Sequence, residues 1–156
     1  MTNIKTTAGD FMARDLRIAV VASRFNESIV ARLLDGAMRT LLRHGAAESA
    51  IELVRVPGAF EIPAAVARVA AARQPDAVIA LGAVIRGETP HFEYICAVCS
   101  EGLGRLALEL SMPIAFGVLT VDDVEQALQR SGPGDDNKGS EAAASAIEMA
   151  RLFRLL

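Results

Sequence analysis

The residues with the clearest chemical potential form one short run, Arg86 to His91. This run follows the apolar segment Ala77–Ile85, and its last residues fit the start of a helix, so the pattern predicts a buried strand, a polar turn and a helix. In an open α/β sheet, ligands bind just outside the carboxyl ends of the strands. The turn therefore offers a cation, a carboxylate, a hydroxyl, free backbone N–H groups and an imidazole to a small anionic substrate.

His91 is one of two histidines in the chain. Its imidazole titrates in the range that suits general acid–base catalysis. At the start of a helix the dipole favours the neutral imidazole, whereas a bound phosphate nearby would oppose that effect. We therefore take His91 as the candidate proton-transfer group, with a purely structural role as the alternative.

The same turn is a candidate phosphate site, because Glu88 and Thr89 directly precede a helix whose N–H groups can bind an anion. Arg130 and Lys138 bracket a glycine-containing loop and could supply positive charge. The alternative is a plain turn in which Thr89 caps the helix and the two cations are solvated. The sequence has neither a GxGxxG nor a P-loop motif, so a bound nucleotide is not expected.

Three phenylalanines lie near predicted strand ends or within a strand. Phe25 and Phe60 follow two strand ends, where an aromatic face can stack on a flat heterocycle. Phe116 lies inside a predicted strand, and its position favours core packing. Glu61, like Glu88, could accept a hydrogen bond from a ligand or assist a proton transfer, with a solvated or capping carboxylate as the alternative.

The elements that must position these residues alternate between strand and helix. Apolar patterning predicts strands at 16–22, 51–56, 77–85 and 114–120, and helices at 26–44, 60–73, 90–110, 122–130 and 138–155. Asn26 is the predicted cap of the first helix, and Gly45 follows its end. This alternation predicts an α/β fold, a doubly wound, flavodoxin-like three-layer α/β/α sandwich with a four-stranded parallel sheet.

The 156 residues fit a single domain over 16–156, preceded by an irregular segment, 1–15, that could dock on a neighbouring copy. A net charge of −3 argues against general nucleic-acid binding. The sequence contains no apolar run long enough to span a membrane and no signal-peptide pattern, so a cytoplasmic protein is expected. Cys96 and Cys99 lie in an apolar stretch, which favours buried thiols over a redox pair or a metal site.

The chain carries several motifs in a fixed order, and they span about residues 16–153. They are Arg24–Asn26, Pro57–Pro63, Leu81–Phe92, Phe116–Gly117, Asn137–Gly139 and Ala146–Met149. Together these motifs closely resemble the lumazine synthase family. The resemblance implies condensation of 5-amino-6-(D-ribitylamino)uracil with 3,4-dihydroxy-2-butanone 4-phosphate to 6,7-dimethyl-8-ribityllumazine, phosphate and water, with no metal and no organic cofactor. Catalysis would consist mainly of positioning and proton transfer.

The resemblance also implies a role for individual residues. His91 would donate and accept protons, Phe25 would stack on the pyrimidine ring, and Glu61 would accept hydrogen bonds from ribityl hydroxyls. The remaining pyrimidine and ribityl contacts would come from Ala59, Phe60, Ala83, Val84, Ile85 and Phe116. The butanone phosphate would be bound by Glu88, Thr89, Arg130 and Lys138.

In the family pattern, Phe116, Arg130 and Lys138 reach the site from the adjacent subunit. The resemblance thus implies a homo-oligomer, a pentamer or an icosahedral shell of sixty chains, and riboflavin synthase as a further partner. The connection from Arg130 to Lys138 lacks the insertion of some pentamer-only members, which favours the shell. Asp135-Asp136 precede Asn137 at a place where the family often has a glycine. This departure from the family pattern also bears on the choice between the pentamer and the shell.

Two other functions are alternatives to the enzyme activity. The first is a flavin- or lumazine-binding protein with little catalysis on the same scaffold; the presence of His91, Arg130 and Lys138 argues against it. The second is a flavodoxin-like signalling or redox module, which predicts a phosphoacceptor aspartate or a bound FMN at a strand end. The first strand ends in Ser23-Arg24, which counts against the phosphoacceptor version.

Overall fold

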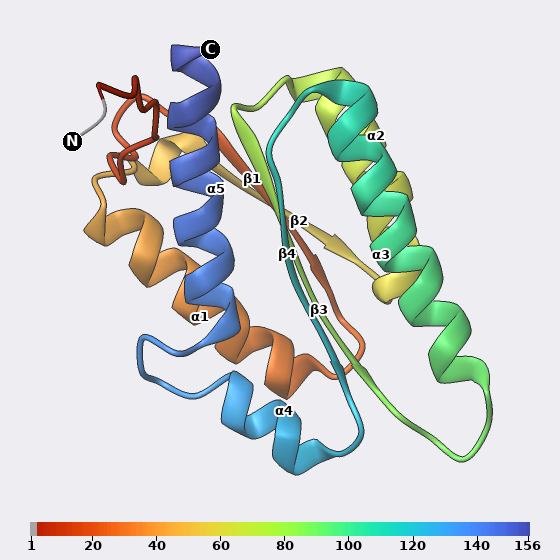
Figure 1. The fold of residues 1–156 in the computed structure, drawn as a ribbon. Coiled ribbons are helices and arrows are strands. Elements are labelled where there is room, and N and C mark those ends of the chain that lie inside the picture. Colours follow the sequence, from red (N-terminus) through yellow and green to blue (C-terminus); the bar gives the residue numbers. More distant parts are fainter. Residues whose placement is uncertain (1–2) are drawn as a thin grey trace.

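A computed structural model describes residues 3–156 as a parallel sheet between two layers of helices. The strands are β1 (Ile18–Ser23), β2 (Ile51–Val56), β3 (Ala77–Ile85) and β4 (Ile114–Val121), in the order β2-β1-β3-β4. The helices are α1 (Glu27–Arg43), α2 (Ile62–Arg73), α3 (His91–Leu110), α4 (Val124–Arg130) and α5 (Lys138–Leu155), with 3-10 turns η1 (Glu48–Ala50) and η2 (Ala59–Glu61). The predicted doubly wound, flavodoxin-like sandwich is confirmed (Figure 1).

The two faces of the sheet carry two separate hydrophobic cores. Helices α1 and α5 cover one face, and α2 and α3 cover the other (Figure 1). Alternate residues of β1 serve the two sides: Ile18 and Val20 pack toward α1 and α5, while Ala19 and Val21 pack toward α2 and α3. Because both faces are covered, β1 is buried along its whole length, as expected for a central parallel strand.

The chain reverses its direction across the sheet at β1. The connection from β1 leads to β2 on one side, and the chain then crosses back to β3 on the other side. Such a reversal opens a crevice at the carboxyl ends of the two central strands. The last pair between β1 and β3 joins Ala22 to Leu81, whereas β3 continues along β4 as far as Ile85. The backbone of Gly82–Ile85 therefore extends past β1 at this crevice.

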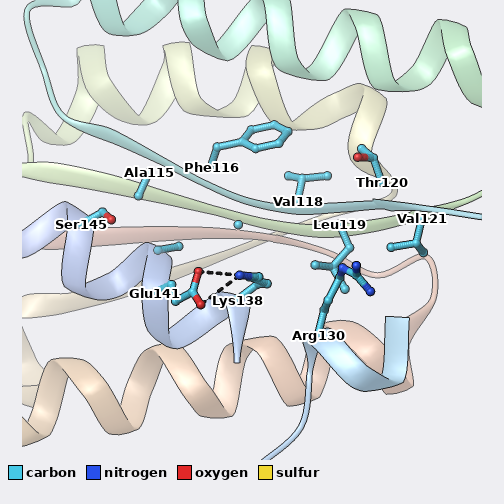
Figure 2. A pocket seen from close by; sticks show the side chains of 12 residues that line it. Ala115, Phe116, Val118, Leu119, Thr120, Val121, Arg130, Lys138, Glu141 and Ser145 are labelled. Carbon is cyan, nitrogen blue, oxygen red and sulfur yellow. Dashed lines mark hydrogen bonds and ion pairs between the residues drawn. The ribbon is translucent and has the colours of Figure 1, made fainter. Parts of the chain in front are cut away.

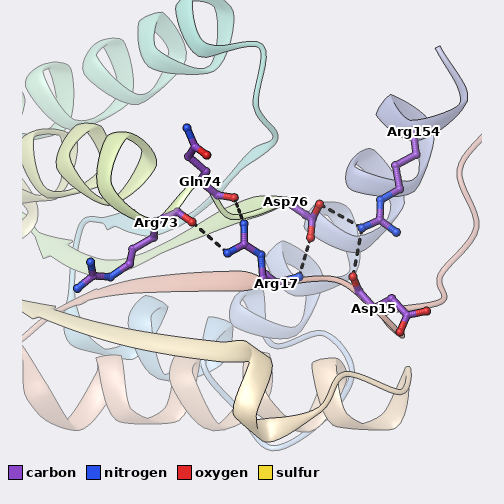
Figure 3. A network of polar contacts seen from close by, with 6 residues as sticks. All are labelled: Asp15, Arg17, Arg73, Gln74, Asp76 and Arg154. Carbon is purple, nitrogen blue, oxygen red and sulfur yellow. Dashed lines mark hydrogen bonds and ion pairs between the residues drawn. The ribbon is translucent and has the colours of Figure 1, made fainter.

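The opposite rim of the sheet is fastened by arginines (Figure 3). The backbone N–H of Arg17 donates to the Asp76 carboxylate at 2.7 Å, and its guanidinium donates to the carbonyl of Gln74. Arg154, at the end of α5, donates to the same carboxylate and to the carbonyl of Asp15, both at 3.1 Å. Asp15 and Gln74 adopt left-handed backbone conformations, with φ of 64° and 49°. These hydrogen bonds hold two unfavourable backbone positions in place.

Two local predictions were wrong. Asn26 precedes α1, but it has a left-handed backbone (φ 59°) and its side chain makes no cap hydrogen bond. The side chain instead donates to the carbonyl of Ala83 at 2.9 Å, because the left-handed turn aims it toward β3. The helix expected from Phe60 begins at Ile62, after the 3-10 turn η2. At the end of α1, Gly45 follows the C-cap with φ +95°, as predicted.

The N-terminal segment packs on its own chain from residue 9 onward. A Cβ at Gly9 would lie 2.0 Å from the carbonyl oxygen of Glu148 on α5, and Asp10 pairs with Arg151 at 3.2 Å. The N–H of Ala13 donates to the carbonyl of His44, the residue after α1, at 2.8 Å. Residues 3–8 are exposed, and the first two residues lie outside the described part of the chain. Docking of this segment on a neighbour stays a prediction.

We predict that the crossing of α5 over α1 is sensitive to a single methyl group. A Cβ at Gly139 would lie 1.9 Å from the carbonyl oxygen of Leu33. This oxygen belongs to the backbone of α1, so it can move only if the helix moves. Gly139→Ala should lower the free energy of unfolding by about 1–3 kcal/mol through overpacking. In the matched control, Gly104→Ala, the new methyl group meets nothing within 4 Å and should add about 0.5–1 kcal/mol of stability through helix propensity. Urea unfolding followed by circular dichroism measures both; equal stability of Gly139→Ala and the parent would contradict the packing.

Candidate functional site

A pocket of about 550 Å³ lies at the crevice formed by the reversal of strand order. Its walls come from the segments that follow β1, β2 and β3, so three separate connections meet there. The lining residues are Phe25, Gly58, Ala59, Phe60, Glu61, His91, Tyr94 and Ile95. Five predicted site residues are thus brought together in one pocket, which we call the aromatic pocket.

The ring of Phe25 faces the pocket from a tightly held turn. Its backbone N–H donates to the carbonyl of Pro57 at 2.9 Å, which continues the pairing of β1 with β2 past the ends of both strands. Arg55 of β2 donates to both carboxylate oxygens of Glu27, at 2.7 and 2.8 Å, and so fixes the start of α1. The Phe25 side chain is nevertheless 71% exposed. An exposed ring on a rigid turn is suited to stacking on a ligand.

The segment after β2 holds its carboxylate by a local hydrogen bond. The Oε2 atom of Glu61 accepts from the N–H of Gly58 at 2.9 Å, so the capping role considered for Glu61 is present. Oε1 has no hydrogen-bond partner among residues 3–156 and remains available to a ligand. Phe60 is 54% exposed, and Ala59 is buried beneath it. The turn thus presents an oriented carboxylate beside an aromatic surface.

The last residues of β3, which were also predicted to contact the substrate, do not line the aromatic pocket. Ala83 is buried, and Val84 and Ile85 are half-buried at the end of the strand. All three pair with β4, and the Ala83 carbonyl also accepts the Asn26 side chain. The structure therefore places these predicted backbone contacts next to the turn that carries Phe25.

The connection from β3 to α3 exposes the other candidate groups. Glu88, Thr89 and His91 are all exposed, and α3 has no side-chain cap, so the capping alternative for Thr89 is wrong. Among residues 3–156, the N–H groups of Gly87, Glu88 and Thr89 donate no hydrogen bond. Unpaired N–H groups at a helix start are the usual anion-binding arrangement. The geometry suits the predicted phosphate turn.

A second pocket, of about 310 Å³, lies along the edge strand β4 and the start of α5 (Figure 2). Arg130 and Lys138 both line it. The Lys138 ammonium pairs with both carboxylate oxygens of Glu141, at 2.8 and 2.9 Å, while Arg130 donates to the Gln126 carbonyl at 3.1 Å. The two predicted cations are therefore close together and accessible. We call this the cationic pocket.

Phe116 of β4 also borders the cationic pocket, and the core packing favoured for it is wrong. The side chain is 46% exposed because β4 is the edge of the sheet, and no part of residues 3–156 covers it fully there. Its ring lies on the opposite side of β4 from Lys138 (Figure 2). An aromatic ring and two cations thus share one open sheet edge.

The position of Lys138 depends on its neighbour Asn137, whose side chain is fully buried. The amide oxygen accepts from the N–H groups of Gly139 and Ser140, at 2.8 and 3.2 Å, and caps α5. The amide nitrogen donates to the carbonyls of Arg32 and Gly132, at 3.1 and 2.8 Å. A single amide therefore ties α1, the loop before α5 and α5 itself together.

The two pockets have no lining residue in common. Phe25, Phe60, Glu61 and His91 line one of them, whereas Phe116, Arg130 and Lys138 line the other. Eight of the thirteen predicted site residues are thus divided between two separate pockets, whereas Ala83, Val84, Ile85, Glu88 and Thr89 line neither of them.

Comparison with known proteins agrees with the motifs. Residues 15–154 match the 6,7-dimethyl-8-ribityllumazine synthase family. The chain belongs to this family. A protein of Halorhodospira halophila (strain DSM 244 / SL1) with that name is 53% identical over 154 residues, covering 98% of this chain and 99% of that protein. One from Aquifex aeolicus (strain VF5), with the same name, is 54% identical over 148 residues, covering 95% and 96%. The resemblance read from the motifs is confirmed.

Membership of the lumazine synthase family makes the chain an enzyme of riboflavin biosynthesis, a transferase. Within residues 3–156, no helix is long and apolar enough to cross a membrane. Over the same residues, no cluster of three or more His, Cys, Asp or Glu side chains could hold a metal ion. Cys99 is buried, and burial raises the pKa of its thiol to about 12; the pKa of Cys96 is also raised by burial. Cys99 is thus a core group, as predicted, whereas Cys96 is half-buried.

The sequence reasoning missed several pocket residues that simple spacing rules could have found. Tyr94 lies three positions after His91 on α3, and therefore on the same face of the helix. Glu141 stands in the same relation to Lys138 on α5. The link from Asn26 to Ala83 had no sequence signal, because it joins residues far apart in the chain.

Proposed function

We propose that the aromatic pocket of one copy and the cationic pocket of another together form the active site for lumazine formation. The observation that carries the proposal is the division of eight predicted site residues between two open pockets of one chain. Neither pocket alone holds both an aromatic platform with an imidazole and a pair of cations. Joining the two pockets across a subunit interface supplies all of them.

In this proposal the pyrimidine substrate lies in the aromatic pocket. Phe25 stacks on the ring, and Phe60 and Phe116 add apolar contact from either side. The free Oε1 atom of Glu61 accepts from ribityl hydroxyl groups. Ala59 and the backbone of Ala83–Ile85 make the remaining contacts. This arrangement orients the amine of the pyrimidine toward the turn that begins α3.

The phosphate of the second substrate lies on the turn formed by Glu88 and Thr89. The unpaired N–H groups of this turn and the N-terminus of α3 favour an anion there. Arg130 and Lys138 arrive from the neighbouring copy and supply positive charge, because the guanidinium of Arg86 is already paired with Glu93 and Asp122. The ketone carbon is thereby held near the amine of the pyrimidine.

His91 transfers protons between the two bound substrates. The amine attacks the ketone and loses water to give an imine, phosphate is then eliminated with loss of a proton from the neighbouring carbon, and closure of the ring releases a second water. Each step moves a proton to or from nitrogen, oxygen or carbon, so one imidazole at the junction of both binding regions can serve all of them. The aromatic pocket and the phosphate turn meet at this residue.

The assembly is a homo-oligomer, a ring of five chains, with the closed shell of sixty favoured by the short connection from Arg130 to Lys138. Riboflavin synthase is the expected partner, because it consumes the lumazine product. Light scattering of the native particle distinguishes the two assemblies, since their masses differ about twelvefold. A monomer at catalytic concentrations would contradict the proposal.

We predict that His91→Ala lowers kcat about 10²-fold, at the low end of general acid–base effects. The loss is limited because His91 is exposed, so that water can take part of its role. Binding of the pyrimidine substrate should be largely unchanged. The measurement is fluorescence of the lumazine product with both substrates varied. Loss of assembly in this variant would favour a structural role, and absence of turnover in the assembled parent would favour the binding protein.

Mixed oligomers test the shared site directly. His91→Ala and Arg130→Ala should each be nearly inactive alone. Unfolding the two together in equal amounts and refolding them should restore about a quarter of the parental activity, because random assortment gives one site in four both intact halves. Mixing the same variants after separate assembly is the control and should restore nothing. A co-refolded mixture as inactive as its components would refute the shared site.

A further inference from the structure

We infer that Arg86 is a positioning residue that fixes the phosphate turn, an inference that rests on the proposed function. The segment from Gly87 to Pro90 has little support of its own. Its N–H groups donate no hydrogen bond within residues 3–156, and α3 has no side-chain cap. A turn that leaves its N–H groups free for a ligand must be held in place by the residues on either side of it. Arg86 directly precedes this turn.

Arg86 makes four contacts that hold the turn in place, two with the end of β4 and the residue after it and two with the start of α3. Its backbone N–H donates to the carbonyl of Val121, the last residue of β4, at 2.9 Å. Its guanidinium donates through Nε to the Asp122 carboxylate at 2.9 Å and through Nη1 to Glu93 in the first turn of α3. The guanidinium carbon also lies 4.4 Å from the centre of the Phe92 ring. The start of α3, which carries His91, is thus joined to the end of β4.

The charges of this cluster matter as well as its geometry. Both carboxylates are ionised at neutral pH, and hydrogen bonds from Arg86 lower the pKa of Glu93 and of Asp122 further. Without Arg86, two anionic groups would stand unpaired beside the turn that binds phosphate. Arg86 therefore keeps the turn in place and reduces the repulsion of an anionic substrate.

The three side chains are largely solvent-exposed, with 45% exposure for Arg86, 56% for Glu93 and 62% for Asp122. Ion pairs as exposed as these contribute little to global stability. The effect of Arg86 should therefore be on the affinity for the phosphorylated substrate, while the unfolding midpoint stays nearly constant. That separation distinguishes a positioning role from a merely structural one.

The test compares Arg86→Gln with Arg73→Gln in the full-length assembled protein. Arg73 is a matched control, because it is an exposed arginine whose side chain pairs with Glu52 at 3.2 Å, on the opposite rim of the sheet from the site. We expect Arg86→Gln to raise KM for the butanone phosphate about tenfold and to change KM for the pyrimidine less than about twofold. Arg86→Lys should recover part of the loss, and Arg73→Gln should change neither constant.

Binding of inorganic phosphate, measured by calorimetry on the same variants, gives a second measurement that does not require turnover. Arg86→Gln should weaken it by a factor similar to the rise in KM. If Arg86→Gln fails to assemble, Arg86→Lys, which keeps the charge but loses the fork of guanidinium donors, replaces it and should raise KM for the butanone phosphate about threefold. The role of Arg86 would be overturned if Arg86→Gln changed the KM values for both substrates equally, or if it changed neither value, like Arg73→Gln. Absence of turnover in the parent would instead overturn the proposed function.

Discussion

The site depends on the reversal of strand order at β1. Right-handed crossovers place α1 on one face of the sheet and α2 and α3 on the other, so the connections after β1 and β3 leave in opposite directions. No helix can fill the gap between their first residues. Phe25 and His91 therefore meet across an open pocket, although the whole of β2 and α2 separates them in the chain.

The strand β4 forms the edge of the sheet and has a neighbouring strand on one side only. Its exposed positions include Phe116, and the cations beside it are anchored by the buried amide of Asn137. Such a buried amide is stable only with its hydrogen bonds satisfied, and here it makes four. The chain thus holds Lys138 rigidly at a surface that its own aromatic pocket does not reach. In the proposed assembly these groups are available to another copy.

Much of the fold could be read from the sequence, because its signals are local. The bounds of β3 and α5 were predicted correctly: β3 is an apolar run that stops at Arg86, and α5 follows a glycine-containing loop. The left-handed turn at Asn26 could not be read, since its hydrogen bond goes to a distant strand. The exposure of Phe116 was missed because strand patterning does not say which strand forms the edge. The motifs identified the family, whereas their division between two pockets needed the coordinates.

The cluster around Arg86 joins these two regions of the chain. One of its partners, Asp122, stands just before α4, and Arg130 is the last residue of that helix. The turn that presents His91 and the helix that ends in Arg130 are therefore fastened to each other within one chain. In the proposed assembly these two parts serve different active sites.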